Sequence, residues 1–369
     1  MALLRELLAF CAGIAVSMVL WHFGPASAGA QSGRAAWDLA NSTDDAPHKD
    51  VPAARPLLKD SEPLDRFIDE LERITVKQTW AGQVLGEVNY YQQHKDRFGN
   101  KADFTTSYLI MNWYAQQNRC GGGTNNALVL LAGANKGQST SNVLSACPKA
   151  RMHIFEIVPK LFQEQQKRFK DSSLVSVHRR GWSDKAQSFH ITAPVQGVEL
   201  AGLYEATGRW KNAPQLNETV DTVPLADFLV EQGIQSQVSY VLIDVEGQEP
   251  NVIRGMRLET NRQIFPLFQY ELGGTWADSR HDAKQWGQYG IAMYLKALGY
   301  TLYLMGGDGG QDLKNLILLN VDPEFFRLIC WRPEAFVDGN LLAVHQTFVD
   351  PGLWTLMQKY VLVPKPQAK

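Results

Sequence analysis

The stretch that decides the fold is Ala127–Thr140, which has the sequence ALVLLAGANKGQST. The apolar run Leu128–Leu131 is typical of a buried parallel strand, and the small residues from Gly133 to Gly137 predict a tight turn after it. Polar, helix-compatible residues follow, so we expect a strand, a turn and then a helix N-terminus. Glycines permit positive φ and close approach of a ligand to the backbone. Ligands bind at the carboxyl ends of such strands.

The composition is that of a globular chain of 369 residues, with a hydrophobic content of 45% and a net charge of -2. Such a chain can bury a substantial core, and its charge gives no support for binding nucleic acid. Of the four cysteines, Cys11 falls in the apolar N-terminal segment, and Cys120, Cys147 and Cys330 fit no zinc-ligand spacing. A Cys120–Cys147 disulfide is one interpretation if the chain is luminal, but we expect buried free thiols.

The N-terminal segment predicts a passage across a membrane. Leu7–Phe23 is apolar and follows Arg5, and sequences ending at Ala28 and Ala30 resemble signal-peptidase sites. Two interpretations stay open for residues 1–30: an uncleaved signal anchor, which we favour, or a cleaved signal peptide. The first predicts a single-pass membrane protein whose folded part is luminal or extracellular, and the second predicts a secreted protein.

The rest of the chain divides by pattern. Residues 31–60 are polar and rich in Ala, Ser and Pro, and they predict a disordered stem. Residues 61–126 predict an N-terminal helical or irregular extension. From 127 to 322, strand patterns alternate with helix patterns, which predicts an α/β domain with a mostly parallel sheet and right-handed crossovers. Residues 323–369 are expected to pack back on this domain as a C-terminal extension.

Acidic residues stand at the ends of several predicted strands. Glu156 lies at the end of the second strand, about twenty residues after the turn, where a carboxylate can bind both hydroxyls of a ribose. Asp244 and Glu246 follow the apolar strand Tyr240–Ile243, and Glu271 ends the next strand. Because the carboxyl ends of parallel strands meet at one edge of a sheet, we expect Glu271 beside Asp244.

The cluster Asp244–Glu249 allows three interpretations. A carboxylate at a buried strand end costs free energy unless it is used or paired. It could orient a substrate or accept its proton. It could also bind a divalent cation through oxygen, or cap the helix expected from Pro250, which would explain Glu249. Ser183 and Asp184 follow the third strand, where they could lie near an adenine or simply form a turn.

Together these motifs resemble those of the FkbM family of S-adenosylmethionine-dependent methyltransferases. The matching residues are Gly133–Gly137, Phe155-Glu156, Ser183-Asp184, Val223–Phe228 and Ile243–Glu249, followed by Glu271. The resemblance covers about Leu128–Leu319. It implies a Rossmann-like class I methyltransferase fold, with a mostly parallel seven-stranded sheet and helices on both faces. It also implies O-methylation of a hydroxyl on a glycan or small-molecule acceptor.

The resemblance implies roles for individual residues and assigns no metal ligand. The residues expected to bind S-adenosyl-L-methionine are Gly133, Ala134, Asn135 and Gly137 at its methionine end, Glu156 at its ribose, Ser183 and Asp184 near its adenine, and Asp244. Asp244, Glu246 and Glu271 are the expected catalytic residues, facing the methyl group and the acceptor. The sequence departs from the family in three places: Leu131 stands where an acid is usual two residues before the first glycine, Ile157 and Val158 displace the proline usual after Glu156, and no asparagine is evident around Gln165. A non-catalytic binding protein with the same fold is therefore the alternative.

Overall fold

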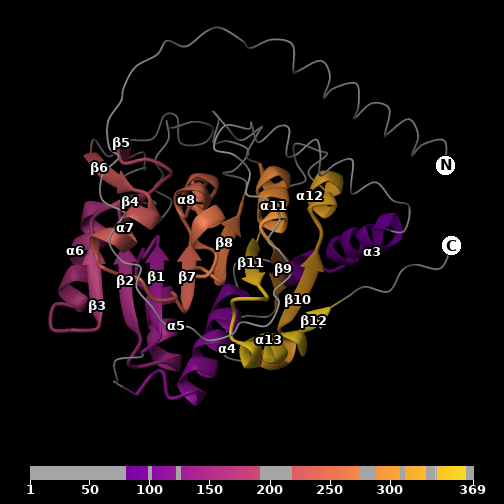
Figure 1. Cartoon of the computed structure of the whole chain (residues 1–369), viewed down its shortest axis with the longest axis horizontal. Helices are drawn as coiled ribbons and strands as arrows, with labels where there is room; N and C mark the ends of the chain where they lie inside the picture. The colour runs from indigo at the N-terminus through magenta and orange to yellow at the C-terminus, as the bar shows by residue number, and fades with distance from the viewer. Residues whose placement is uncertain are drawn as a thin grey trace, which may run out of the picture. The chain divides into compact units, whose positions relative to one another are not determined.

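The computed structural model describes residues 80–98, 102–121, 126–191, 218–273, 287–307, 312–329, 337 and 339–362 (Figure 1). All of the described residues belong to one compact unit, which lies within residues 60–369. The predicted anchor Leu7–Phe23 and the predicted stem lie outside the described residues. Within the described ranges, no helix has the length and apolar character needed to cross a membrane.

The described residues form one nine-stranded sheet in the order β12-β10-β9-β11-β8-β7-β1-β2-β3 (Figure 1). Its strands are β1 (Leu128–Ala132), β2 (Arg151–Phe155), β3 (Val175–His178), β7 (Tyr240–Ile243), β8 (Leu267–Leu272), β9 (Tyr300–Gly306), β10 (Ile317–Val321), β11 (Gly339–His345) and β12 (Val361–Leu362). β3, β2, β1, β7 and β8 are parallel neighbours. β11 runs antiparallel to both β8 and β9, and β10 runs antiparallel to β9. The sheet is thus mostly parallel, as predicted.

The predicted number of seven strands is wrong, because the sheet also contains β11 and β12. Both come from residues 323–369, which we expected to pack on the domain as an extension. β11 instead lies inside the sheet, between β8 and β9, and all seven of its residues are buried. The boundary predicted after residue 322 therefore does not mark the end of the sheet.

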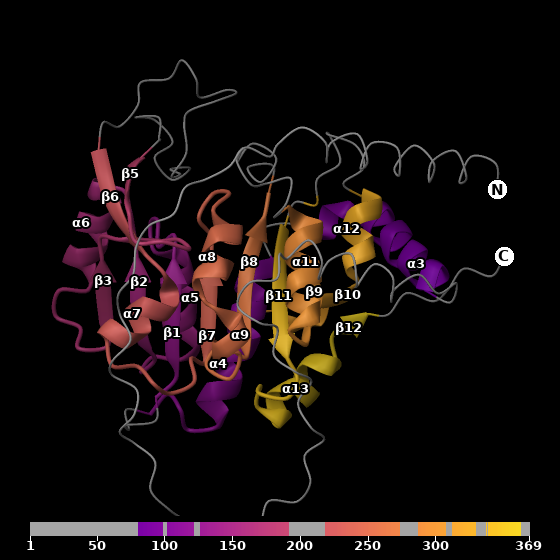
Figure 2. The same cartoon turned by 45° about the horizontal axis from the view of Figure 1, so that its top comes forward.

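Helices cover both faces of the sheet, as predicted, and Figure 2 shows α8 and α11 in front of it. One core cluster includes side chains of α3 (Trp80–Gln93), α7 (Leu225–Glu231), α8 (Glu249–Gly255), α9 (Leu258–Asn261), α11 (Gln288–Ala297) and α12 (Pro323–Ile329). The other includes α4 (Ala102–Gln116), α5 (Gln138–Ala146) and α13 (Pro351–Gln358). α6 (Pro159–Arg168) packs beside β3. α3 and α4 thus belong to the core, although they fall in the predicted N-terminal extension.

β1 shows how the sequence places the two cores. Leu128, Leu130 and Ala132 belong to the first cluster, whereas Val129 and Leu131 belong to the second. This is the alternation of a strand with both faces covered, and it explains the continuous apolar run. A separate small sheet follows β3, in the order β4 (Gly181–Trp182), β6 (Glu218–Val223) and β5 (Ser188–Ile191).

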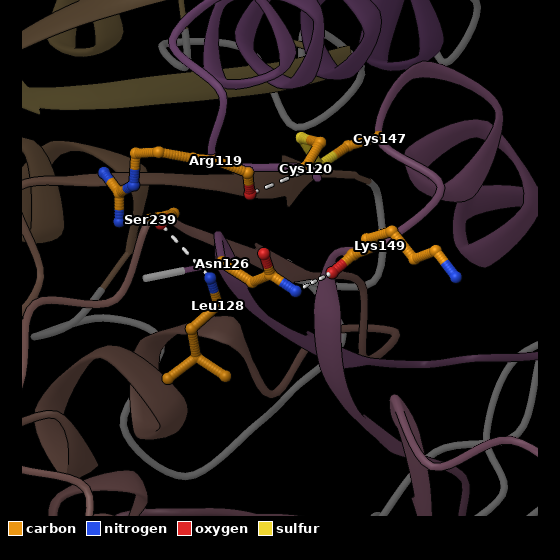
Figure 3. The surroundings of a disulfide bond; sticks show 7 residues. All are labelled: Arg119, Cys120, Asn126, Leu128, Cys147, Lys149 and Ser239. Atoms are coloured by element: carbon orange, nitrogen blue, oxygen red, sulfur yellow. Dashed lines mark hydrogen bonds between the residues drawn. A yellow bond between two sulfur atoms is a disulfide. The ribbon is translucent and has the colours of Figure 1, made fainter. Parts of the chain in front are cut away.

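A disulfide joins Cys120 to Cys147, and their Cα atoms are 5.1 Å apart (Figure 3). The expectation of free thiols at these positions is therefore wrong. Cys120 follows α4 and Cys147 caps the end of α5, so both lie near the start of β1. Asn126 donates a hydrogen bond to the backbone oxygen of Lys149 over 2.7 Å in the same region. The closed loop contains β1, the glycine turn and α5.

Candidate active site

The turn after β1 is possible only with glycine at its first position. Gly133 has a φ of 80°, in the left-handed region. A Cβ built on Gly133 would collide with the backbone oxygen of Asp244, because the chain leaving β7 passes directly beside the turn. The close approach of these two backbones brings the turn beside the segment from Asp244 to Gln248, between β7 and α8, which we call the acidic loop.

Every backbone N–H from Gly133 to Gly137 has an acceptor within the protein. The N–H groups of Gly133 and Ala134 both donate to the backbone oxygen of Phe155. The N–H of Asn135 donates to Glu156, that of Lys136 to the Asn135 side chain, and that of Gly137 to the backbone oxygen of Ala134. The turn is therefore held in shape by the protein itself.

Glu156 faces the glycine turn from the end of β2. Its Oε2 accepts the N–H of Asn135 over 2.6 Å, and its Oε1 accepts the N–H of Val158 over 2.9 Å. Glu156 is 5% exposed, and burial raises the pKa of its carboxyl while these backbone donors lower it. Because carboxylate oxygens have further lone pairs, the brace leaves Glu156 able to accept hydroxyl donors.

A pocket opens at the carboxyl ends of β1, β2 and β7. Its lining residues are Ala132, Gly133, Asn135, Phe155, Glu156, Ile157, Leu161, Arg180, Gly181, Trp182, Asp244, Val245 and Glu246. Five predicted site residues therefore share it, namely Gly133, Asn135, Glu156, Asp244 and Glu246. Leu131 does not fill it, because this side chain packs in the second core cluster.

Other predicted site residues lie outside the lining of this pocket. Ala134 and Gly137 belong to the turn but are not among the lining residues. Asp184 forms an ion pair with Arg254 of α8 at 3.1 Å and accepts a hydrogen bond from Ser183. A Cβ on Gly255 would collide with the backbone oxygen of Ser183. In this structure Ser183 and Asp184 thus hold α8 against β4, and the preceding residues 180–182 line the pocket.

Glu249 is the residue whose role the sequence did not reveal. It is fully buried at the start of α8, and its two oxygens accept the N–H groups of Val245 and Gly247 over 2.8 and 2.9 Å. Burial, together with the charge of Glu271, raises the pKa of Glu249 to about 8. Its carboxyl fixes the acidic loop, in which Glu246 and Gly247 have positive φ values of 55° and 100°.

The three residues predicted to be catalytic lie together. Carboxylate oxygens of Asp244, Glu246 and Glu271 are all within 4.8 Å of one another. Asp244 is exposed, and the other two are half-buried. Carboxylates this close repel each other unless a proton, a cation or a positively charged ligand lies among them. The arrangement can accept a proton, orient a hydroxyl or bind a divalent cation, so these alternatives stay open.

Residues 132–302 match the family model of the methyltransferase FkbM domain. The chain carries an FkbM methyltransferase domain. The match begins at the end of β1 and ends within β9, so it contains the glycine turn, Glu156, the acidic loop and Glu271. It supports methylation that depends on S-adenosylmethionine. The predicted family is thereby confirmed.

Several methyltransferases are among the solved structures that the chain matches, each at low sequence identity. Cofactor-bound Rv0187 from MTB is 12% identical, with a TM-score of 0.34, over 79% of this chain and 100% of that one. The O-methyltransferase from Bacillus cereus in complex with SAH is 11% identical, with a TM-score of 0.34, over 76% and 96%. The N-methyltransferase NodS from Bradyrhizobium japonicum WM9 is 12% identical, with a TM-score of 0.25, over 64% and 94%. Among curated proteins, none matches the chain.

Proposed function

We propose that the domain binds S-adenosyl-L-methionine in the pocket at the glycine turn and methylates a hydroxyl of a glycan or small molecule. The observation that carries this proposal is the meeting of two elements in one pocket. The turn braced by Glu156 forms one wall, and Asp244 and Glu246 of the acidic loop form the other. The first is suited to holding an adenosyl ligand, and the second to a reacting hydroxyl.

The chemistry of the pocket residues supports binding of this cofactor. Gly133, without a side chain, leaves the turn open to close approach, and Glu156 has acceptor capacity for ribose hydroxyls. Ile157, Leu161 and Trp182 supply the apolar surface that a purine needs. When bound, S-adenosyl-L-methionine supplies a positively charged sulfonium and a transferable methyl group. The carboxylates of Asp244 and Glu246 match that positive charge.

The catalytic part that we assign to the protein is orientation and proton acceptance. A hydroxyl held beside Asp244, Glu246 and Glu271 would be fixed by hydrogen bonds to their carboxylates. Orientation of two reactants can supply about 7–11 kcal/mol toward the barrier. One carboxylate of the three would take the hydroxyl proton. Two other charged side chains line the pocket: Glu156, whose oxygens already accept the N–H groups of Asn135 and Val158, and Arg180, which is a cation.

The second candidate is a non-catalytic binding protein with the methyltransferase fold. Leu131 motivates it, because an apolar side chain that is 1% exposed occupies the position of the family's usual acid. A lost charged contact of this kind is worth about 1.5–3 kcal/mol. Binding of S-adenosyl-L-methionine without methyl transfer to any hydroxylated acceptor would favour this candidate.

We also propose that the folded domain is luminal or extracellular, attached through the N-terminal segment or secreted after its cleavage. The Cys120–Cys147 disulfide supports this location, since such bonds persist in oxidising compartments. Protease protection of the full chain in sealed microsomes tests it. Digestion by protease added outside the vesicles would contradict it.

Isothermal titration with S-adenosyl-L-methionine and its demethylated product tests the proposed function. We expect both ligands to bind the wild-type chain and the Glu156→Ala variant to lose most of this affinity. The matched control is Glu164→Ala, because Glu164 is exposed on α6. Absence of binding by the wild type at millimolar ligand would contradict the proposal.

A further inference from the structure

Helix α6 holds the glycine turn through a side chain that lies outside the pocket lining. Gln165 is 2% exposed, and its Nε2 donates a hydrogen bond to the backbone oxygen of Asn135 over 2.8 Å. Its contact is therefore with the turn, whereas the ligand space is lined by other residues. Neither the strand pattern nor the resemblance assigned a role to Gln165.

Asn135 is the point of the turn where such support is needed. Its φ of 48° lies in the left-handed region, which residues with a Cβ rarely adopt. Glu156 accepts its N–H from one side, and Gln165 donates to its carbonyl from the other. The peptide groups on both sides of Asn135 are thus fixed by neighbouring elements. Because Asn135 lines the pocket, its conformation also sets the shape of the pocket wall.

Arg168, one helical turn further along α6, packs on the same segment. Its Nη2 donates to Oγ of Ser141 over 2.7 Å, and its Nη1 donates to the backbone oxygen of Lys136 over 3.4 Å. A Cβ on Gly137 would lie 2.6 Å from Nη1 of Arg168 and 2.8 Å from Oε1 of Gln165. The absence of a side chain at Gly137 therefore lets α6 approach the turn.

The amide of Gln165 is poorly explained by stability alone. Its Oε1 is buried and has no hydrogen-bond partner within the described part of the chain. A buried acceptor without a partner destabilises a fold, and an apolar side chain of similar length would avoid that cost. The gain from this amide is the bond from Nε2 to the turn.

We propose that Gln165 is a positioning residue for the cofactor: by holding the carbonyl of Asn135, it presets the glycine turn in the conformation that binds S-adenosyl-L-methionine. This inference rests on the proposed function. It also gives the turn an ordering contact in a chain that has Leu131 in place of the family's acid.

The test is Gln165→Met, which keeps the length of the side chain and removes the donor. Loss of one hydrogen bond of ordinary strength predicts a Kd for the demethylated cofactor about fivefold higher by calorimetry. We expect little change in Tm, because the variant loses the bond to the Asn135 carbonyl and also removes the buried Oε1 that has no partner within the described residues. In turnover, the KM for S-adenosyl-L-methionine should rise while kcat at saturation stays unchanged. The control is Gln166→Met, at the next and exposed position of α6, which should change none of these values.

A second variant and a second measurement do not depend on turnover. Gln165→Glu replaces the donor with a carboxylate beside the Asn135 carbonyl, and it should weaken binding further. In Gln165→Met without ligand, amide hydrogen exchange should accelerate at residues 135–137 and stay unchanged in β7. A wild-type Kd in Gln165→Met, or a rise in Kd matched by Gln166→Met, overturns the inference alone. Absence of cofactor binding by the wild type overturns the inference together with the proposed function.

Discussion

The glycine turn and the acidic loop stand at neighbouring strand ends and are each braced by a buried glutamate, yet they offer different groups to the pocket. In the turn, each backbone N–H from Gly133 to Gly137 has an acceptor, and Glu156 is itself held by backbone donors. On the other side, Asp244 and Glu246 of the loop and Glu271 of β8 have carboxylate oxygens within 4.8 Å of one another. The comparison teaches that the glycine turn offers a preset backbone for binding a ligand, whereas the acidic residues concentrate negative charge where a reaction can use it.

The largest loss of stability is expected for a substitution at Gly133, where the glycine turn touches the acidic loop. Gly133→Ala would place a Cβ against the backbone oxygen of Asp244 at a φ of 80°, so the turn and the loop would have to separate. We expect a loss of about 3 kcal/mol or more in unfolding free energy, measured in urea. Gly233→Ala is the control, because Gly233 has a φ of 63° but nothing within 4 Å of the added Cβ. It should cost about 1 kcal/mol, and equal losses would show that the contact between the walls is unimportant.

Removing the carboxylates of Asp244, Glu246 and Glu271 one at a time should separate catalysis from cofactor binding. Asp244→Asn, Glu246→Gln and Glu271→Gln each keep the shape of the side chain. The variant that lacks the general base should lose about 10²–10⁴-fold in kcat. Its affinity for the demethylated cofactor should change much less, because the turn is intact. Methylation assays measure kcat, and isothermal titration calorimetry measures the affinity for the demethylated cofactor. If all three variants kept the wild-type kcat, the general base would not be one of these three carboxylates.

The Cys120–Cys147 disulfide closes a loop of the chain that contains the glycine turn, so it should stabilise the fold. Cys120 and Cys147 are 27 residues apart in sequence, and the segment between them includes β1, the turn and α5. Replacing both cysteines by serine should lower the unfolding free energy by about 3–4 kcal/mol through the looser unfolded chain. The reduced wild type should match this variant in urea denaturation. Equal unfolding free energies for the reduced and the oxidised protein would contradict this prediction.

The buried carboxyl of Glu249 should make the stability of the domain depend on pH. The pKa of Glu249 rises from 4.5 to about 8 on folding, so the folded state binds the proton more tightly. The contribution of Glu249 to the unfolding free energy should therefore be fully present below the unfolded pKa and be lost between about pH 4.5 and 8. Glu249→Gln should flatten this slope, whereas Glu164→Gln on the exposed face of α6 should keep it. Thermal unfolding across this pH range measures both. An identical slope in wild type and Glu249→Gln would count against the role of Glu249.

The sequence predicted the features that depend on local pattern. The run Leu128–Leu131 followed by glycines was sufficient for β1 and its turn, and Tyr240–Ile243 was predicted with the bounds that the structure has. β11 was missed, although Leu341–Val344 is also a continuous apolar run. Its place between β8 and β9 comes from pairing with strands far away in the chain, which periodicity does not report.

The site shows the same division between local and distant information. Acids at strand ends could be found from the sequence, and three of them do meet at one rim. The brace of Gln165 on Asn135 spans 30 positions, and the disulfide spans 27. Such contacts depend on how the helices pack against the sheet, so a motif within one segment of the sequence cannot predict them. Asp184 illustrates the limit, because its partner Arg254 lies on α8, after β7 in the chain.

The most direct measurement is the affinity of the full chain for S-adenosyl-L-methionine in the wild type and in Glu156→Ala, by isothermal titration calorimetry. The account predicts one site per chain in the wild type and a large loss of affinity in the variant, with Glu164→Ala unchanged. A wild type that binds no ligand at millimolar concentration, or a Glu156→Ala variant that binds as tightly as the wild type, would contradict it.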